Sequence, residues 1–119
     1  MKVNNFHIQI TSEDPDRLRG FYRDTVGLPT VPEVGDGAFS VGSANLFIDG
    51  HSETKGKTGE PQRMLVDLVV DDVAAEQARL EGQGVSFIRS AGKEEWGGTI
   101  STFADPDGNY CQLVQYPQG

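Results

Sequence analysis

The sequence contains a single cysteine and no long hydrophobic segment. Because Cys111 has no second cysteine to pair with, no disulfide can form within the chain, and we expect a reducing, cytoplasmic environment. No run approaches the roughly 18 consecutive apolar residues of a membrane helix, and no apolar region of the signal-peptide type precedes Phe6. These absences predict a cytoplasmic protein without a membrane-spanning helix.

Basic residues are also scarce. The 119 residues include 10 Lys and Arg against 18 Asp and Glu, which gives a formal net charge of −8. An acidic surface repels a phosphate backbone, so we expect no nucleic-acid partner, and it weakly favours a cationic ligand. Hydrophobic residues make up 36% of the chain, which is enough for a packed core, and the 15 glycines suit tight turns between short strands.

A strand-then-helix pattern occurs twice along the chain. Alternating residues lead to Asp14, which can cap a helix that ends at Gly27. The same order recurs with residues 63–70 as the strand and a helix from Asp72 to Gly84. The nearly equal spacing of the two caps and of the two glycines indicates an internal duplication.

Short strand patterns follow each expected helix. In the first half they meet at Gly42-Ser43, a two-residue hairpin turn, and in the second half the last two meet at residues 105–109, DPDGN. A polar, glycine-rich stretch separates the halves. The pattern predicts an α+β fold of two tandem βαβββ modules, at residues 1–55 and 61–119, joined by a linker at residues 56–60.

The module order, the FYRDTVGL helix end, the Trp96-Gly97 pair and DPDGNYCQLVQ together resemble the vicinal oxygen chelate superfamily of glyoxalases, bleomycin resistance proteins and extradiol dioxygenases. The resemblance implies that the two modules form a curled mixed sheet around a central cavity. It also implies a homodimer, in which the two chains can exchange modules. One such scaffold hosts unrelated reactions, so the function must be argued from the site.

In metal-binding members, the resemblance implies one ligand on the first strand and one on the last strand of each module. The first strands place His7 and Leu65 at these positions, and the last strand of the second module places Gln112 there. The matching position in the first module is Leu46, or Ile48 if the register differs by two residues. Because hydrocarbon side chains cannot coordinate a metal ion, we expect neither a metal nor a cofactor.

Strand alternation predicts a mostly apolar pocket with a few polar groups. Asp67 is the most unusual member, because a carboxylate within an apolar strand needs a partner or water. His7 is equally well explained as a hydrogen-bonded core histidine, and Trp96 as a packing residue beside a glycine turn. The candidate ligand-binding residues are His7, Gln9, Phe39, Leu46, Leu65, Asp67, Trp96 and Gln112.

We therefore expect a protein that binds a small organic molecule without a metal ion, as in drug or metabolite sequestration. An alternative is a lyase, isomerase or dioxygenase that acts through His7, Asp67 and Gln112 with an atypical metal site. A second alternative is a structural or regulatory module without a ligand. A bound divalent ion would favour the enzyme, and a cavity filled by the protein's own side chains would favour the module.

Overall fold

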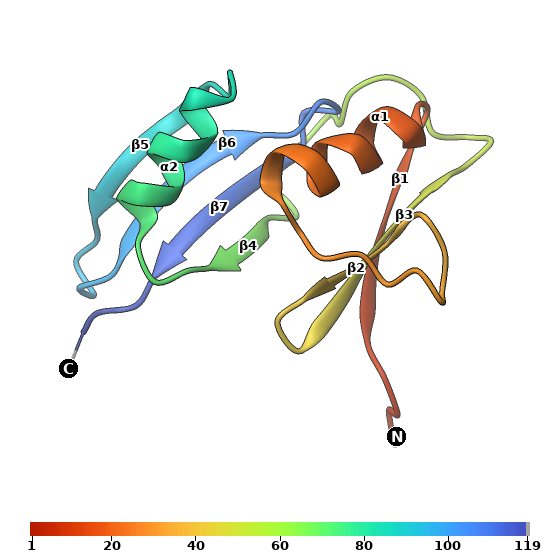
Figure 1. Cartoon of the computed structure of the whole chain (residues 1–119), viewed down its shortest axis with the longest axis horizontal. Helices are drawn as coiled ribbons and strands as arrows, with labels where there is room; N and C mark the ends of the chain where they lie inside the picture. Colours follow the sequence, from red (N-terminus) through yellow and green to blue (C-terminus); the bar gives the residue numbers. More distant parts are fainter. Residues whose placement is uncertain (119) are drawn as a thin grey trace. The chain divides into compact units, whose positions relative to one another are not determined.

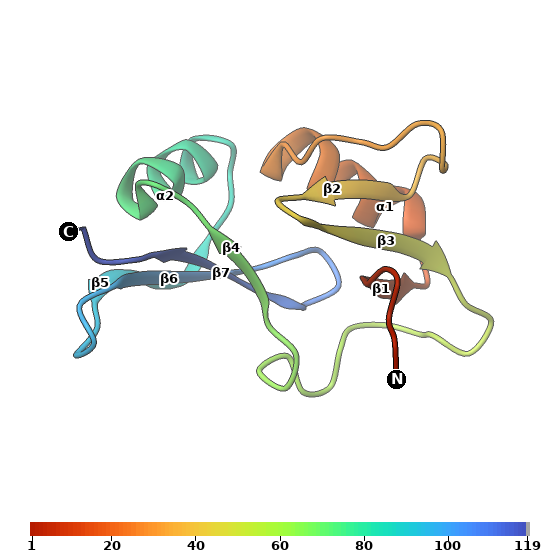
Figure 2. The same cartoon turned by 90° about the horizontal axis from the view of Figure 1, so that it is seen from below.

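The computed structural model describes residues 1–118. The chain forms two compact units, and the boundary between them in the sequence follows Gly56. In each unit a helix packs on one face of a mixed parallel and antiparallel sheet (Figures 1 and 2). The predicted α+β fold is confirmed, and neither sheet is closed. Among the described residues, no helix has the length and hydrophobicity needed to cross a membrane.

The first unit has one helical segment and three strands. The strand order is β1-β3-β2, with β1 parallel and β2 antiparallel to β3. The elements are β1 (His7–Ser12), α1 (Pro15–Gly20), its π-helical continuation η1 (Phe21–Val26), β2 (Ala38–Val41) and β3 (Ala44–Gly50).

A fourth strand of the first module is reduced to one bridge, between Thr30 and Phe39. The flanking residues Pro29 and Pro32 explain the loss, because proline has no N–H to donate to a strand ladder. The first unit is therefore a shortened version of the predicted module.

The helical segment of this unit begins and ends as its sequence indicates. The Asp14 carboxylate accepts a hydrogen bond from the backbone N–H of Arg17, and Gly27 ends the segment in a left-handed conformation with φ of 86°. Leu18 and Tyr22 lie on its inner side and are fully buried. These two side chains anchor the helix on the sheet.

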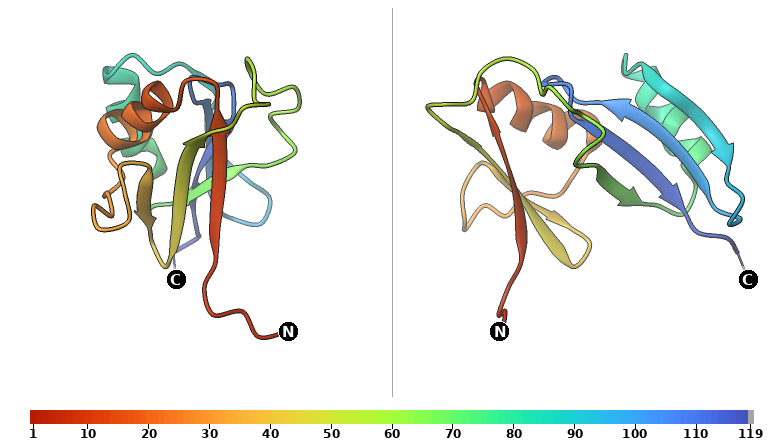
Figure 3. Two further views of the ribbon diagram at one scale, coloured as in Figure 1. Left: turned by 90° about the vertical axis from the view of Figure 1, so that its right-hand side faces the viewer. Right: turned by 180° about the vertical axis from the view of Figure 1, so that it is seen from behind.

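The second unit has the complete strand–helix–three-strand order. Its sheet order is β4-β7-β6-β5, with β4 parallel to β7 and the other neighbours antiparallel; the strands lie side by side in the right-hand view of Figure 3. The first strand is shorter than the predicted 63–70. The elements are β4 (Val66–Val69), α2 (Val73–Gly82), β5 (Phe87–Lys93), β6 (Thr99–Ala104) and β7 (Tyr110–Gln115).

The predicted turn at residues 105–109 is confirmed. Its centre is the buried Asp105 carboxylate, which accepts hydrogen bonds from the backbone N–H groups of Asp107 and Asn109 and from the Asn109 side chain, all at 2.9 Å. Gly108 has the positive φ of 83° that such a turn requires. The turn places β7 antiparallel to β6.

The core of the second unit contains one buried hydroxyl group without a partner. Phe103 is fully buried and its ring lies 5.3 Å from that of Phe87. Ser101 lies two residues earlier on the same sheet face and is also fully buried, but its Oγ has no hydrogen-bond partner within residues 1–118. Burying an unpaired hydroxyl destabilises the folded state.

We therefore expect Ser101→Ala to raise the free energy of unfolding by about 1 kcal/mol, because the substitution removes an unsatisfied polar atom while keeping nearly the same volume. Urea denaturation measures the change. The control Ser90→Ala, at an exposed position of β5, should leave stability almost unchanged. A loss of stability in Ser101→Ala would show that the hydroxyl has a partner in solution.

Candidate functional site

The open face of the first unit, opposite its helix, presents an aromatic pair. The sheet register pairs His7 with Asn45 and Gln9 with Phe47, so these side chains share one face. The rings of His7 and Phe47 are stacked, with centroids 4.1 Å apart and planes inclined by 22°. His7 is exposed and Phe47 is half-buried, so the stacked pair forms a flat surface that remains accessible within this unit.

Leu46 and Phe39 do not lie on this face. The register pairs Leu46 with both Phe39 and Ile8, on the side of the sheet that carries the helix. Leu46 is 4% exposed and Phe39 is fully buried. The prediction that they share the face of His7 is wrong, because a shift of one residue along a strand moves a side chain to the other face.

Phe47 occupies the place that corresponds to Gln112 in the other unit. Gln9 and Asp67 occupy equivalent positions, because each lies five residues before the aspartate that caps the following helix. The register pairs Gln9 with Phe47 and Asp67 with Gln112, so Phe47 and Gln112 are equivalent as well. The alternative position Ile48 is fully buried in the core and is excluded as well.

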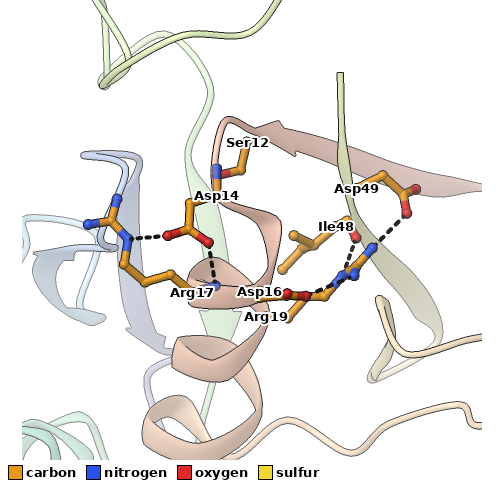
Figure 4. A network of polar contacts seen from close by, with 7 residues as sticks. All are labelled: Ser12, Asp14, Asp16, Arg17, Arg19, Ile48 and Asp49. Atoms are coloured by element: carbon orange, nitrogen blue, oxygen red, sulfur yellow. Dashed lines mark hydrogen bonds and ion pairs between the residues drawn. The ribbon is translucent and has the colours of Figure 1, made fainter. Parts of the chain in front are cut away.

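A network of hydrogen bonds joins Gln9 of the same face to Asp49 of β3 and Arg19 of α1. The Gln9 side-chain Nε2 donates to Asp49 Oδ2 at 2.7 Å, and Asp49 Oδ1 accepts from Arg19 of α1 at 3.1 Å. Arg19 Nε also donates to the backbone carbonyl of Ile48 at 2.8 Å, and its third contact is Asp16 Oδ1 at 3.5 Å (Figure 4). Asp49 thus connects a residue of the open face to the helix.

The open face of the second unit contains a row of polar side chains beside exposed apolar ones. Register partners place Asp67 of β4, Gln112 of β7 and Thr102 of β6 side by side. The amide of Gln112 donates to Thr102 Oγ1 over a long 3.5 Å. Leu65 and Val69 flank Asp67 in the chain and are exposed. This combination of apolar surface and a few polar groups is typical of small-molecule sites.

The Asp67 carboxylate has no hydrogen-bond or ion-pair partner within the part of the chain that the structure describes. Partial burial among the apolar side chains raises the pKa of this carboxyl above its ordinary value of 3.8. A raised pKa means that the folded state binds the proton more tightly than the unfolded state. The resulting stabilisation is complete below the unfolded pKa and is lost as the pH rises through the folded pKa.

Asp67→Asn should therefore stabilise the protein at neutral pH by less than about 1 kcal/mol, because the site is largely solvent-screened, and should have almost no effect at pH 3. Urea denaturation at both pH values measures the difference. Asp71→Asn, at a neighbouring exposed aspartate, is the matched control. An equal effect of Asp67→Asn at both pH values would contradict the assignment of burial as the cause.

Trp96 lies at the tip of the β5–β6 hairpin. Its ring makes an edge contact with Tyr116 at a centroid distance of 6.3 Å and is 52% exposed. The ring also covers Gly98, where a Cβ atom would overlap it. This packing agrees with a structural role for Trp96.

The donor set does not fit a divalent metal ion. Three of the positions implied by the resemblance hold His7, Leu65 and Gln112, and the register puts Phe47 at the fourth in place of the expected Leu46. Two of these side chains are hydrocarbon and one is a neutral amide. Iron or zinc needs three or four imidazole, carboxylate or thiolate donors. Within residues 1–118, no three side chains of His, Cys, Asp or Glu come together as metal ligands could.

The fold and sequence are shared with a known superfamily. A sequence profile of the Glyoxalase/Bleomycin resistance protein/Dioxygenase superfamily matches residues 6–113, and the chain belongs to this superfamily. A comparison with curated proteins found no match.

Solved structures with the same fold come from several bacteria. A superfamily member from Sphaerobacter thermophilus is 19% identical, with a TM-score of 0.74 and coverage of 98% of this chain and 99% of that one. A lactoylglutathione lyase from Agrobacterium tumefaciens is 19% identical, with a TM-score of 0.71 and coverage of 96% and 94%. An integron cassette protein from the mobile metagenome of V. cholerae is 24% identical, with a TM-score of 0.71 and coverage of 98% of both chains. These likenesses support the fold alone.

Proposed function

We propose that this chain is a binding protein that holds a small organic molecule on its open sheet faces without a metal ion, as in the sequestration of a drug or metabolite. The observation that carries the proposal is the stacked pair of His7 and Phe47, because an aromatic ring stands where a chelating member needs a donor atom. A flat aromatic surface favours a planar ligand through dispersion and stacking.

The polar groups beside the apolar surface supply orientation. In the first unit Gln9 lies on the face of the aromatic pair. In the second unit Asp67 lies between the exposed Leu65 and Val69, and Gln112 is its register partner on β7. A few fixed hydrogen-bonding groups on a mostly apolar surface select among ligands of similar size. The formal charge of −8 favours a cationic or neutral ligand over an anionic one.

The absence of a bound metal is tested by elemental analysis of protein prepared without chelator and without a nickel affinity step. We expect iron, zinc, manganese and nickel at amounts far below one per chain. Any of these metals at one equivalent per chain would overturn the proposal and favour a chelating enzyme.

Binding itself is tested with aromatic fragments and amide NMR spectra. Indole is a suitable probe because it is planar and uncharged at neutral pH. We expect its addition to shift the backbone amide signals of β1 and β3 around His7 and Phe47. If no aromatic fragment shifts signals on either open face, the proposal fails, and a structural or regulatory module becomes the better explanation.

A catalytic role is the second candidate, and the raised pKa of Asp67 is the observation that favours it. Carboxyl groups shifted toward neutral pH serve as general acids or bases. The enzyme hypothesis assigns the reaction to His7, Asp67 and Gln112. It predicts that any lyase, isomerase or dioxygenase turnover would be strongly reduced in His7→Ala.

We also propose that the protein forms a homodimer, in which the two chains can exchange modules. In the first unit β1 is an edge strand, and Phe6 beside it is 63% exposed. Exposed strand edges and apolar side chains favour association with another chain. A monomer in light scattering at micromolar concentration would exclude the dimer.

A further inference from the structure

The hydrogen bond between Gln9 and Asp49 determines which way the Gln9 amide faces. An ionised carboxylate can only accept hydrogen bonds, so the group directed at Asp49 must be the NH2 of the amide, 2.7 Å from Oδ2. The amide oxygen is then directed away from Asp49. Without such a partner, the two orientations of a glutamine amide would be nearly equivalent.

Asp49 is itself held from the helix side. Arg19 donates to its Oδ1 at 3.1 Å and is tied to the backbone by its hydrogen bond to the carbonyl of Ile48. Arg19 reaches this position because residue 37 is glycine: a Cβ atom there would overlap the Ile48 carbonyl oxygen and lie 2.7 Å from Arg19 Nε. The carboxylate is thus fixed by two partners, one on each oxygen.

We infer that Asp49 is a positioning residue that turns the oxygen of Gln9 toward the ligand, so that the ligand carries an N–H or O–H donor beside its planar part. The inference rests on the proposed function, since it concerns the same face as the stack of His7 and Phe47. The corresponding position of the second unit agrees with it, because Asp67 there is a carboxylate and accepts hydrogen bonds when ionised.

Two probes of equal shape test the donor requirement. Indole and benzofuran are both planar and neutral, but indole carries an N–H donor where benzofuran has an oxygen. We expect indole to bind the β1–β3 face about fivefold more tightly than benzofuran, which is the ratio that one hydrogen bond provides. Amide NMR titrations of the full chain give both dissociation constants, and the use of neutral probes removes the effect of the net charge.

Substitutions of the network test the positioning role. Asp49→Asn offers both a donor and an acceptor to Gln9, so the indole-to-benzofuran ratio should fall toward one while both probes still bind. The two side-chain N–H signals of Gln9 should also move closer together. The control Glu33→Gln removes the same charge from an exposed site of the same unit and should leave the ratio unchanged.

Gln9→Leu provides a second variant at an exposed strand position, in case Asp49→Asn does not fold. It removes the acceptor entirely and should bring the ratio to one. If both probes bind wild-type protein equally, or Asp49→Asn leaves the ratio unchanged, the inference is overturned while the proposed function stands. If neither probe binds, the inference is overturned, and the proposed function fails as well if no other aromatic fragment shifts signals on either open face.

Discussion

Replacing Asp105 by alanine is expected to lower the free energy of unfolding by about 3 kcal/mol. The carboxylate is almost completely buried and accepts three hydrogen bonds within the turn, one of them from the Asn109 side chain. A hydrogen bond to a charged group contributes about 1.5–3 kcal/mol. The substitution would leave the buried N–H of Asp107 and the half-buried donors of Asn109 without the carboxylate. The contributions are not additive, so the expected total is well below their sum.

Two further variants make this experiment specific. Asp105→Asn keeps one acceptor oxygen but turns its NH2 toward the NH2 of Asn109, so its loss of stability should be intermediate. Asp71→Ala removes an exposed aspartate of the same unit and should cost less than about 0.5 kcal/mol. If Asp105→Ala were as stable as Asp71→Ala in urea denaturation, the assignment of the carboxylate as the centre of the turn would be wrong.

The turn also affects the candidate site. It places β7 against β6, and that pairing sets Gln112 beside Thr102. If the Asp105→Ala variant still folds, we therefore expect NMR shift changes at Gln112 as well as in the turn. Asp105, which lies outside the proposed binding face, would then affect the position of a residue on that face.

Phe47→Ala is expected to weaken indole binding about tenfold. The substitution removes the half-buried ring that stacks on His7 at 4.1 Å, and with it one of the two rings of the stacked pair. An aromatic contact contributes about 0.5–1.5 kcal/mol beyond the area it buries, and the lost apolar contact adds to this value. The dissociation constant from the NMR titration measures the effect.

The control for this prediction is Phe6→Ala. Phe6 is an exposed phenylalanine that precedes β1, so the variant loses the same side chain outside the stacked pair. It should bind indole like the wild type, and thermal unfolding should confirm that both variants are folded. Equal weakening in the two variants would indicate non-specific attraction to aromatic surface rather than binding at His7 and Phe47.

The pattern in β3 shows how the position of Phe47 could have been recognised. Leu46 and Ile48 are two aliphatic residues in alternation, which is typical of the buried face of a strand. The residue between them must then lie on the open face with His7. The position implied by the resemblance, Leu46, lies one residue before Phe47. The first unit also departs from the predicted module, because a single bridge replaces its second strand.

The sequence by itself determined the local elements of this protein. The caps at Asp14 and Asp72, the hairpin at Gly42-Ser43 and the turn around Asp105 depend on hydrogen bonds and backbone angles within a few residues, so the residue types are sufficient to predict them. The family resemblance added the expectation that the strands form a mixed sheet, which both units have.

Only the tertiary structure decided what the open faces carry. The parallel pairing of β1 with β3 joins segments far apart in the chain, and its register depends on how the core packs under the helix. That register sends Leu46 and Phe39 into the core, stacks His7 on Phe47 and brings Gln9 to Asp49. Composition and spacing predict a strand, but long-range packing selects which of its two faces remains open.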